Sequence, residues 1–98
     1  MDKDLSIFVA ISDPAIFIRA YNLVRALRNL DIISDTEWMG RSLKAQMRWA
    51  DKEGFTHVII LGDVDVIKDM KSSRQYEVDA NEFYSPKKEP ITIKVTIR

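Results

Sequence analysis

The basic residues of segment 41–53 are the side chains best suited to bind a ligand. They recur every three or four positions, at Arg41, Lys44, Arg48 and Lys52. On a helix this spacing predicts one narrow row along ~20 Å, which could follow a phosphate backbone. Arg41 and Lys44 would lie near the helix N-terminus, where the helix dipole favours anions. A solvated face, partly neutralised by acidic neighbours, is the more common role of such a row.

Two further side chains extend this hypothesis from phosphates to bases. Trp38 lies just upstream of the basic row, where its indole could stack on an unpaired base. Reading a base edge also requires hydrogen-bonding groups, which Arg41 or Gln46 could supply. The second tryptophan, Trp49, lies outside the apolar face of the predicted helix and could stack as well, but we expect it to pack against the protein.

Catalytic chemistry has few candidates in this chain. There is no Cys, and the single histidine, His57, begins an apolar strand at the end opposite to the usual ligand site of an α/β sheet. Asp63 and Asp65 follow that strand, where a Mg²⁺ site for phosphoryl chemistry could lie, yet the same spacing describes a solvated hairpin face. No phosphate-binding loop accompanies them. We therefore expect no catalytic residue, no metal and no cofactor.

The predicted elements form an α/β domain. Residues 5–11 and 57–61 are apolar without alternation, which is typical of strands buried on both faces. A helix is predicted over 14–30, with Asp13 as its capping residue, and a second over 41–53, with Gly54 just past its end. Residues 31–36 form a shorter strand nearer a sheet edge, and 64–68 and 74–78 form a hairpin or a pair of short strands. The order predicts a parallel sheet with helices on both faces.

The C-terminal residues 91–98, ITIKVTIR from Ile91 to Arg98, alternate between apolar and polar, as a half-buried strand does. They follow a linker-like stretch at 85–90, which separates them from a domain over 1–84. Two interpretations stay open. The segment is either a sixth strand at the edge of its own sheet, or a strand that pairs with a second copy and makes a homodimer.

Composition limits the classes of function. The chain has 98 residues, which is one domain, with 15 basic and 15 acidic residues and no net charge. Neutrality argues against a general nucleic-acid binder, so any RNA contact must come from a local patch. The absence of Cys fits the cytoplasm. No apolar run approaches ~18 residues and the polar start is not a signal peptide, so we expect no membrane association.

The segments RSLKAQ (41–46), WADK (49–52) and VIILG (58–62) resemble the C-terminal anticodon-binding domain of class II aminoacyl-tRNA synthetases, closest to the histidyl branch. The resemblance continues through IKDM (67–70) and RQYEV (74–78), and covers roughly residues 5–79. It implies a three-layer α/β/α fold with a mixed, mostly parallel five-stranded sheet. The chain departs from related domains by its short join after Gly62 and by a C-terminal strand in place of a final helix.

The resemblance implies a non-catalytic module that binds the tRNA anticodon loop, by analogy that of histidine tRNA. The chain is too short to hold a catalytic core, and Met1 close to the first strand suits either a complete small protein or an excised piece. The alternative is a protein-interaction or dimerisation module that kept the fold and lost RNA binding. The RNA-binding residues implied or proposed are Ser12, Asp13, Trp38, Arg41, Lys44, Gln46, Arg48, Lys52, Gly62 and Asp63.

Overall fold

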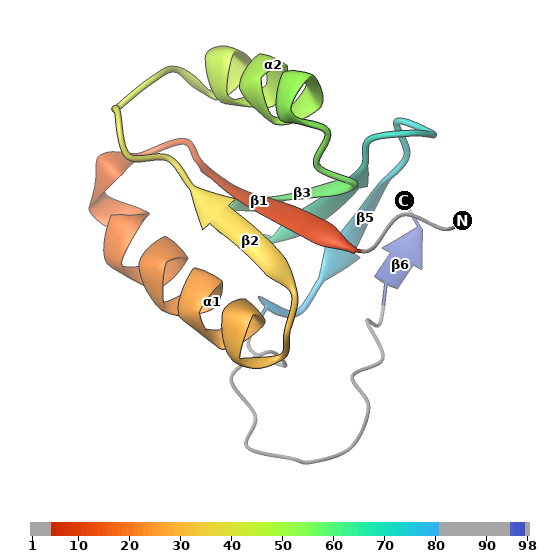
Figure 1. The fold of residues 1–98 in the computed structure, drawn as a ribbon, viewed down its shortest axis with the longest axis horizontal. Helices are drawn as coiled ribbons and strands as arrows, with labels where there is room; N and C mark the ends of the chain where they lie inside the picture. The colour runs from red at the N-terminus through yellow and green to blue at the C-terminus, as the bar shows by residue number, and fades with distance from the viewer. Residues whose placement is uncertain (1–4, 81–94, 98) are drawn as a thin grey trace.

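A six-stranded mixed sheet with one α-helix on each face forms the part of the chain that this computed structural model describes, residues 5–80 and 95–97 (Figure 1). The strand order is β2-β1-β3-β4-β5-β6. The strands are β1 (Ser6–Ile11), β2 (Ile33–Thr36), β3 (His57–Leu61), β4 (Val66–Asp69), β5 (Gln75–Val78) and β6 (Val95–Ile97).

The α/β class and the mixed sheet are confirmed, but the expectation of a mostly parallel sheet was wrong. β1 pairs in parallel with β2 and β3, whereas β3–β4, β4–β5 and β5–β6 are antiparallel. A parallel neighbour requires a long crossover, and the helical segments before β2 and β3 supply the two that make β1 parallel to both strands. The connections from β3 to β4 and from β4 to β5 are short turns, which can join only antiparallel strands.

The helix on one face is α1 (Phe17–Asn29), which follows a short 3₁₀ turn, η1 (Pro14–Ile16). The predicted cap is confirmed, because the Asp13 side chain accepts from the Ala15 backbone N–H at 2.9 Å. The helix buries Ala20, Leu23, Val24 and Leu27 against the sheet.

The helix on the other face, α2 (Leu43–Glu53), is shorter than predicted at its start. The Ser42 hydroxyl accepts from the Ala45 backbone N–H at 3.2 Å, so Ser42 is the capping residue and Arg41 precedes the helix. Gly54 ends the helix in the left-handed conformation with φ 79°, as predicted. The four predicted cations therefore do not share one helix.

The central strands divide the core into two layers, because alternate side chains point to opposite faces of the sheet. Ile7, Val9 and Ile11 of β1 pack with α1, whereas Phe8 and Ala10 pack with Ala50 of α2. β1 is buried almost throughout, as its unbroken apolar run predicted.

The C-terminal segment contributes β6, which pairs with β5 within the same chain. Its register sets Tyr76 opposite Ile97 and Val78 opposite Val95. This pairing corresponds to the first of the two interpretations. The predicted linker at 85–90 lies outside the described residues. Neither helix in residues 5–80 has the length and hydrophobicity of a membrane-crossing segment.

Candidate nucleic-acid interface

The loops that follow β1, β2 and β3 all lie at the end of the sheet formed by the carboxyl ends of these strands, because the three strands run parallel. We call this region the loop edge, and it comprises residues 12–13, 37–42 and 62–65. The carboxyl ends of parallel strands are the usual ligand site of open α/β sheets. Ser12, Asp13, Trp38, Gly62 and Asp63 are all exposed there. The fold therefore brings the predicted loop residues to a common edge.

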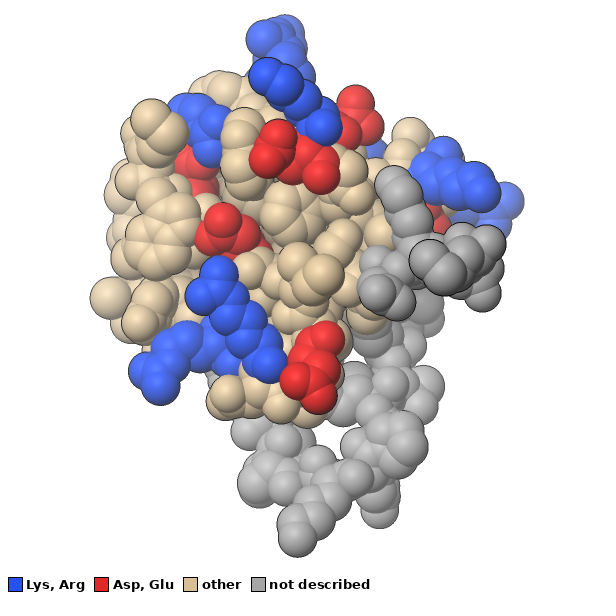
Figure 2. All heavy atoms as spheres, viewed as in Figure 1, with Lys and Arg blue, Asp and Glu red and all other residues tan. Residues whose placement is uncertain are grey.

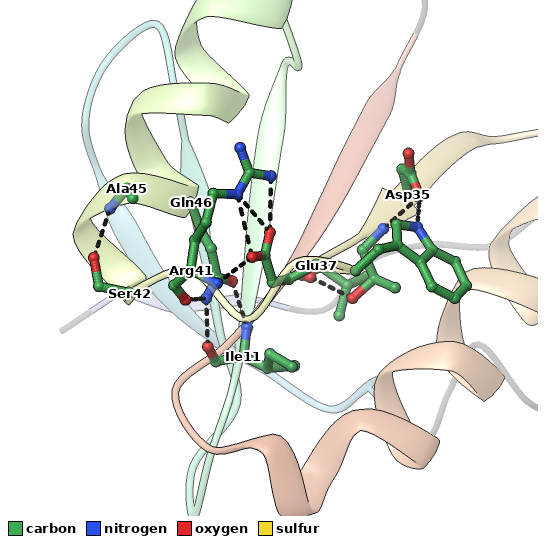
Figure 3. A network of polar contacts seen from close by, with 10 residues as sticks. Ile11, Asp35, Glu37, Arg41, Ser42, Ala45 and Gln46 are labelled. Carbon is green, nitrogen blue, oxygen red and sulfur yellow. Dashed lines mark hydrogen bonds and ion pairs between the residues drawn. The ribbon is translucent and has the colours of Figure 1, made fainter.

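An ion pair between a buried carboxylate and a half-buried arginine holds the longest of these loops. Glu37 is 2% exposed, and its carboxylate accepts from the Arg41 guanidinium, with Nη2 at 2.8 Å and Nε at 3.1 Å from Oε1 (Figure 3). The carboxylate also accepts from the Arg41 backbone N–H. The Arg41 guanidinium lies 5.2 Å from the centre of the Trp49 ring. Arg41 is thus largely engaged within the protein.

The charges of this pair reinforce one another. Burial raises the pKa of Glu37, but the hydrogen bonds and charge of Arg41 outweigh burial and leave that pKa below its ordinary value. In turn, the hydrogen bond to Glu37 raises the pKa of Arg41. Both pKa shifts favour the ionised forms, so the ion pair persists near neutral pH and holds the loop in one conformation.

Gln46 has a structural position rather than one that faces solvent. It is 1% exposed, and its side-chain oxygen accepts from the Ile11 backbone N–H at 2.9 Å. Its side-chain nitrogen donates to the carbonyl oxygens of Ile11 and Arg41, both at 2.8 Å (Figure 3). The amide therefore ties α2 to the end of β1 and to the loop, and it does not offer an edge to a base.

Trp38 stands at the surface with its ring held in place. It is 56% exposed, and its Nε1–H donates to Asp35 Oδ1 at 2.7 Å. The indole meets Phe17 and Tyr21 edge-on, with ring centroids 5.3 and 6.1 Å away. We call Phe17, Tyr21 and Trp38 the outer aromatic cluster. The exposed part of the fixed indole suits stacking on a planar ring.

The remaining basic residues of the predicted row, Lys44, Arg48 and Lys52, are exposed on α2. Lys44 is in the first turn of the helix, where the helix dipole disfavours a cation and favours an anion. Figure 2 shows basic side chains over α2 and over α1 with acidic side chains between them, not one continuous basic face.

The two aspartates after β3 have different environments, which corrects the view that they share a face. Asp65 is buried at 9% exposure, and its Oδ1 accepts from Arg19 Nη1 at 2.8 Å. Asp63 is exposed in the turn before β4. Within residues 5–80, no three His, Asp or Glu side chains gather as metal ligands. The phosphoryl-transfer hypothesis therefore loses the carboxylate pair on which it depended.

The sequence reasoning missed Glu37, Tyr21 and Phe17. Phe17 and Tyr21 are four residues apart, so they share a helix face, and Ile18 beside them is 67% exposed. That pair of aromatic residues next to an exposed isoleucine was the available signal. No comparable signal in the sequence marks Glu37, because its burial depends on how the loop folds back onto Arg41.

Known proteins resemble this chain over one part of their length. No protein-family model matches it. The histidine–tRNA ligase of Desulforamulus reducens is 35% identical over 83 residues, which are 79% of this chain and 20% of that protein. The enzyme of Clostridium novyi is 32% identical over 85 residues, or 81% of this chain and 20% of that protein. The chain therefore spans about one fifth of the length of these relatives.

Solved structures share the fold. The Staphylococcus aureus histidyl-tRNA synthetase has a TM-score of 0.73 at 23% identity, over 83% of this chain and 25% of that one. The RNA-binding domain of Cryptosporidium parvum threonyl-tRNA synthetase has a TM-score of 0.70 at 8% identity, over 79% of this chain and 21% of that one. Together with the sequence matches, they identify the chain as a relative of the C-terminal part of histidine–tRNA ligases, with the fold of the anticodon-binding domain of class II aminoacyl-tRNA synthetases.

Proposed function

We propose that this chain is a non-catalytic module that binds tRNA at the anticodon loop through the loop edge. Its relatives make histidine tRNA the first candidate. The matched region is about one fifth of each ligase, so we propose that aminoacylation, where it occurs, requires a catalytic body outside this chain. We also propose a cytoplasmic location, and a homodimer in which residues 91–98, whose β6 forms one edge of the sheet, pair with a second copy.

The observation that carries the proposal is the position of Trp38. It is a half-exposed indole, fixed by Asp35 and two aromatic rings, at the edge where a sheet of this fold binds ligands. Recognition of single-stranded RNA combines stacking on such rings with contacts to phosphates. Lys44, exposed in the first turn of α2, supplies a cation for those phosphates. The engaged side chains of Arg41 and Gln46 serve to position this surface.

The test is fluorescence anisotropy of labelled histidine tRNA against the full chain at about 50 and 200 mM salt. A second RNA has the same body and a different anticodon. We expect tighter binding of the histidine anticodon. We also expect Lys44→Ala to reduce the slope of log affinity against log salt by about 0.7, the value for one single-stranded phosphate contact.

Lys71→Ala is the matched control, because Lys71 is exposed in the turn between β4 and β5, at the opposite edge of the sheet. It should leave both affinity and slope unchanged. Equal binding of the two anticodons would contradict anticodon recognition. Equal effects of Lys44→Ala and Lys71→Ala would exclude the loop edge as the contact surface.

A second candidate function is a protein-interaction module. Net neutrality and several large, exposed apolar side chains favour it, since contact surfaces expose such side chains. These side chains are Ile18, Tyr21, Ile33, Trp38 and Met39, with exposed fractions of 67, 38, 63, 56 and 77%. If no tRNA binds, this candidate takes precedence. A double variant, Ile18→Ser with Met39→Ser, should then abolish capture of the partner protein without a loss of folding.

A further inference from the structure

A surface groove of about 480 Å³ lies beside the loop edge, between α1 and Trp38. Its lining combines aromatic, cationic and amide side chains from Tyr21, Val24, Arg25, Arg28, Asn29 and Trp38. Basic side chains are visible over α1 in Figure 2. Apart from Trp38, none of these residues belongs to the RNA-binding set predicted from the sequence.

Two aromatic rings form one side of the groove. Trp38 and Tyr21 are fixed against each other at 80° between their planes, and both are exposed. Such a corner presents the face of one ring and the edge of the other to a ligand bound in the groove. A flat, apolar ring fits this corner better than a branched aliphatic group, because stacking needs a planar partner.

The cationic side of the groove has two exposed arginines, one of which is held by a backbone carbonyl. The Arg28 guanidinium donates to the Ser34 carbonyl oxygen, with Nε at 3.1 Å and Nη2 at 3.0 Å. Arg28 also lies 3.9 Å from Asp35, whose carboxylate is held by Trp38, so the acidic charge nearby is compensated. Arg25 is exposed, and its guanidinium lies 5.9 Å from the centre of the Tyr21 ring. Its donors can reach an anion beside a stacked ring.

We propose that this groove holds an unpaired nucleotide that flanks the anticodon in the bound tRNA loop. The base stacks in the corner of Trp38 and Tyr21, and its phosphate is bound by Arg25. The inference rests on the proposed function and extends it, because Trp38 belongs to both the loop edge and the groove. In this arrangement the bound RNA extends from the ends of the parallel strands onto the outer face of α1.

The test compares Arg25→Glu with Arg74→Glu in the full chain. Both arginines are exposed, but Arg74 lies beside the turn before β5, at the opposite edge of the sheet. The ligands are the histidine anticodon stem-loop and the same stem-loop with another anticodon. Phosphate contacts do not read sequence, so Arg25→Glu should weaken both RNAs equally, by about tenfold at low salt. The preference between anticodons should not change.

A second measurement reports the stacking directly. The chain has two tryptophans, so Trp49→Phe leaves Trp38 as the only indole fluorophore. We expect the stem-loop to quench Trp38 emission, and we expect Arg25→Glu to shift the quenching to about tenfold higher RNA concentration. Circular dichroism melting of each variant excludes a loss of folding as the cause.

The outcomes separate the two hypotheses. If Arg25→Glu behaves as Arg74→Glu does while the anticodon preference persists, the groove is not an RNA site and the proposed function stands. If wild type binds both stem-loops equally, anticodon recognition fails and the flanking-nucleotide assignment fails with it. If an acidic, aromatic peptide quenches Trp38 and the stem-loop does not, the groove is a protein-binding site and the inference is overturned.

Discussion

Two clusters of three aromatic rings lie on opposite faces of the sheet, and they differ in burial. Phe8, Trp49 and Phe55 form the inner aromatic cluster beneath α2, with ring centroids 5.2 to 5.8 Å apart. The outer aromatic cluster packs at 5.3 to 6.4 Å beside α1 and remains open to solvent at Trp38. Each cluster has an arginine over one of its rings, Arg41 over Trp49 and Arg25 over Tyr21.

The same residue types therefore serve two purposes. The inner rings remove apolar area from water and stabilise the fold. The outer rings leave much of their area exposed, which is costly for solubility unless a ligand covers it. The Glu37–Arg41 pair lies between them, because Arg41 contacts Trp49 on one side and Glu37 precedes Trp38 on the other. The following predictions test this division.

The largest effect should come from Phe8→Ala. Phe8 is fully buried and contacts both other rings of the inner cluster, so its loss should lower the free energy of unfolding by about 3–5 kcal/mol. Trp38→Ala should cost less than about 1 kcal/mol, because the indole is half exposed. Urea unfolding measures both. Equal losses would show that the outer cluster is also part of the core.

Glu37→Gln should have the next largest effect on stability. The substitution keeps the shape of the side chain but removes the charge that Arg41 pairs with, at a buried position. We expect a loss of about 1–3 kcal/mol in urea unfolding at neutral pH. Asp51→Asn, an exposed carboxylate on α2, is the control and should change little.

The same pair predicts a pH dependence. The pKa of Glu37 is lower in the folded state than its ordinary value, so the carboxylate contributes stability above that value. This contribution is lost as pH falls below about 4.5 toward the folded-state pKa. Asp69 also has a lowered pKa, through hydrogen bonds from the Ser72 and Lys71 backbone N–H groups, and it adds to acid sensitivity. The difference between wild type and Glu37→Gln should therefore shrink at acid pH; a constant difference would refute the role of this charge.

Trp38→Ala should separate binding from stability. The loss of one stacked base corresponds to about 1–3 kcal/mol in tRNA affinity, while the melting temperature stays nearly unchanged. Trp38→Phe keeps a stacking ring and should retain most of the affinity. Anisotropy titration with histidine tRNA measures the change. An unaffected affinity would remove the outer aromatic cluster from the RNA surface.

The smallest effect should come from Arg48→Ala. Arg48 is exposed midway along α2, and surface charges of this kind contribute under about 0.5 kcal/mol to stability. If it contacts a phosphate, the salt slope should fall by about 0.7, equally for both anticodons. A loss of affinity for only one of the two anticodons would assign base recognition to α2 and not to the outer aromatic cluster.

Most of the fold follows from local patterns in the sequence. The apolar runs of β1 and β3, the Asp13 cap and Gly54 each act over a few residues, so their signals survive without tertiary information. The directions of β4 and β5 depend on the short connections that precede them. The shortness of these connections is visible in the sequence, whereas the resemblance implied a mostly parallel sheet.

The site was less predictable because the role of each residue depends on its hydrogen-bond and ion-pair partners in the folded chain. Arg41 and Gln46 have types suited to RNA, yet the fold commits them to Glu37 and to the end of β1. Glu37 belongs to the same irregular loop as Arg41, and Ile11 belongs to β1, so the periodicity within one helix or strand predicts neither contact. Conversely, Arg25 and Tyr21 lie on α1, and only the folded loop places Trp38 beside them.

The Gln46 side chain also affects how the molecule opens. It binds both backbone groups of Ile11 as a neighbouring strand would, so the last residue of β1 is closed by an amide from α2. The Ile11 amide hydrogen can then exchange with solvent once the Gln46 side chain leaves it, as happens when α2 lifts from the sheet or the whole domain unfolds. The exchange rate of the Ile11 amide hydrogen therefore reports the detachment of α2. RNA bound on the loop edge would slow this exchange further.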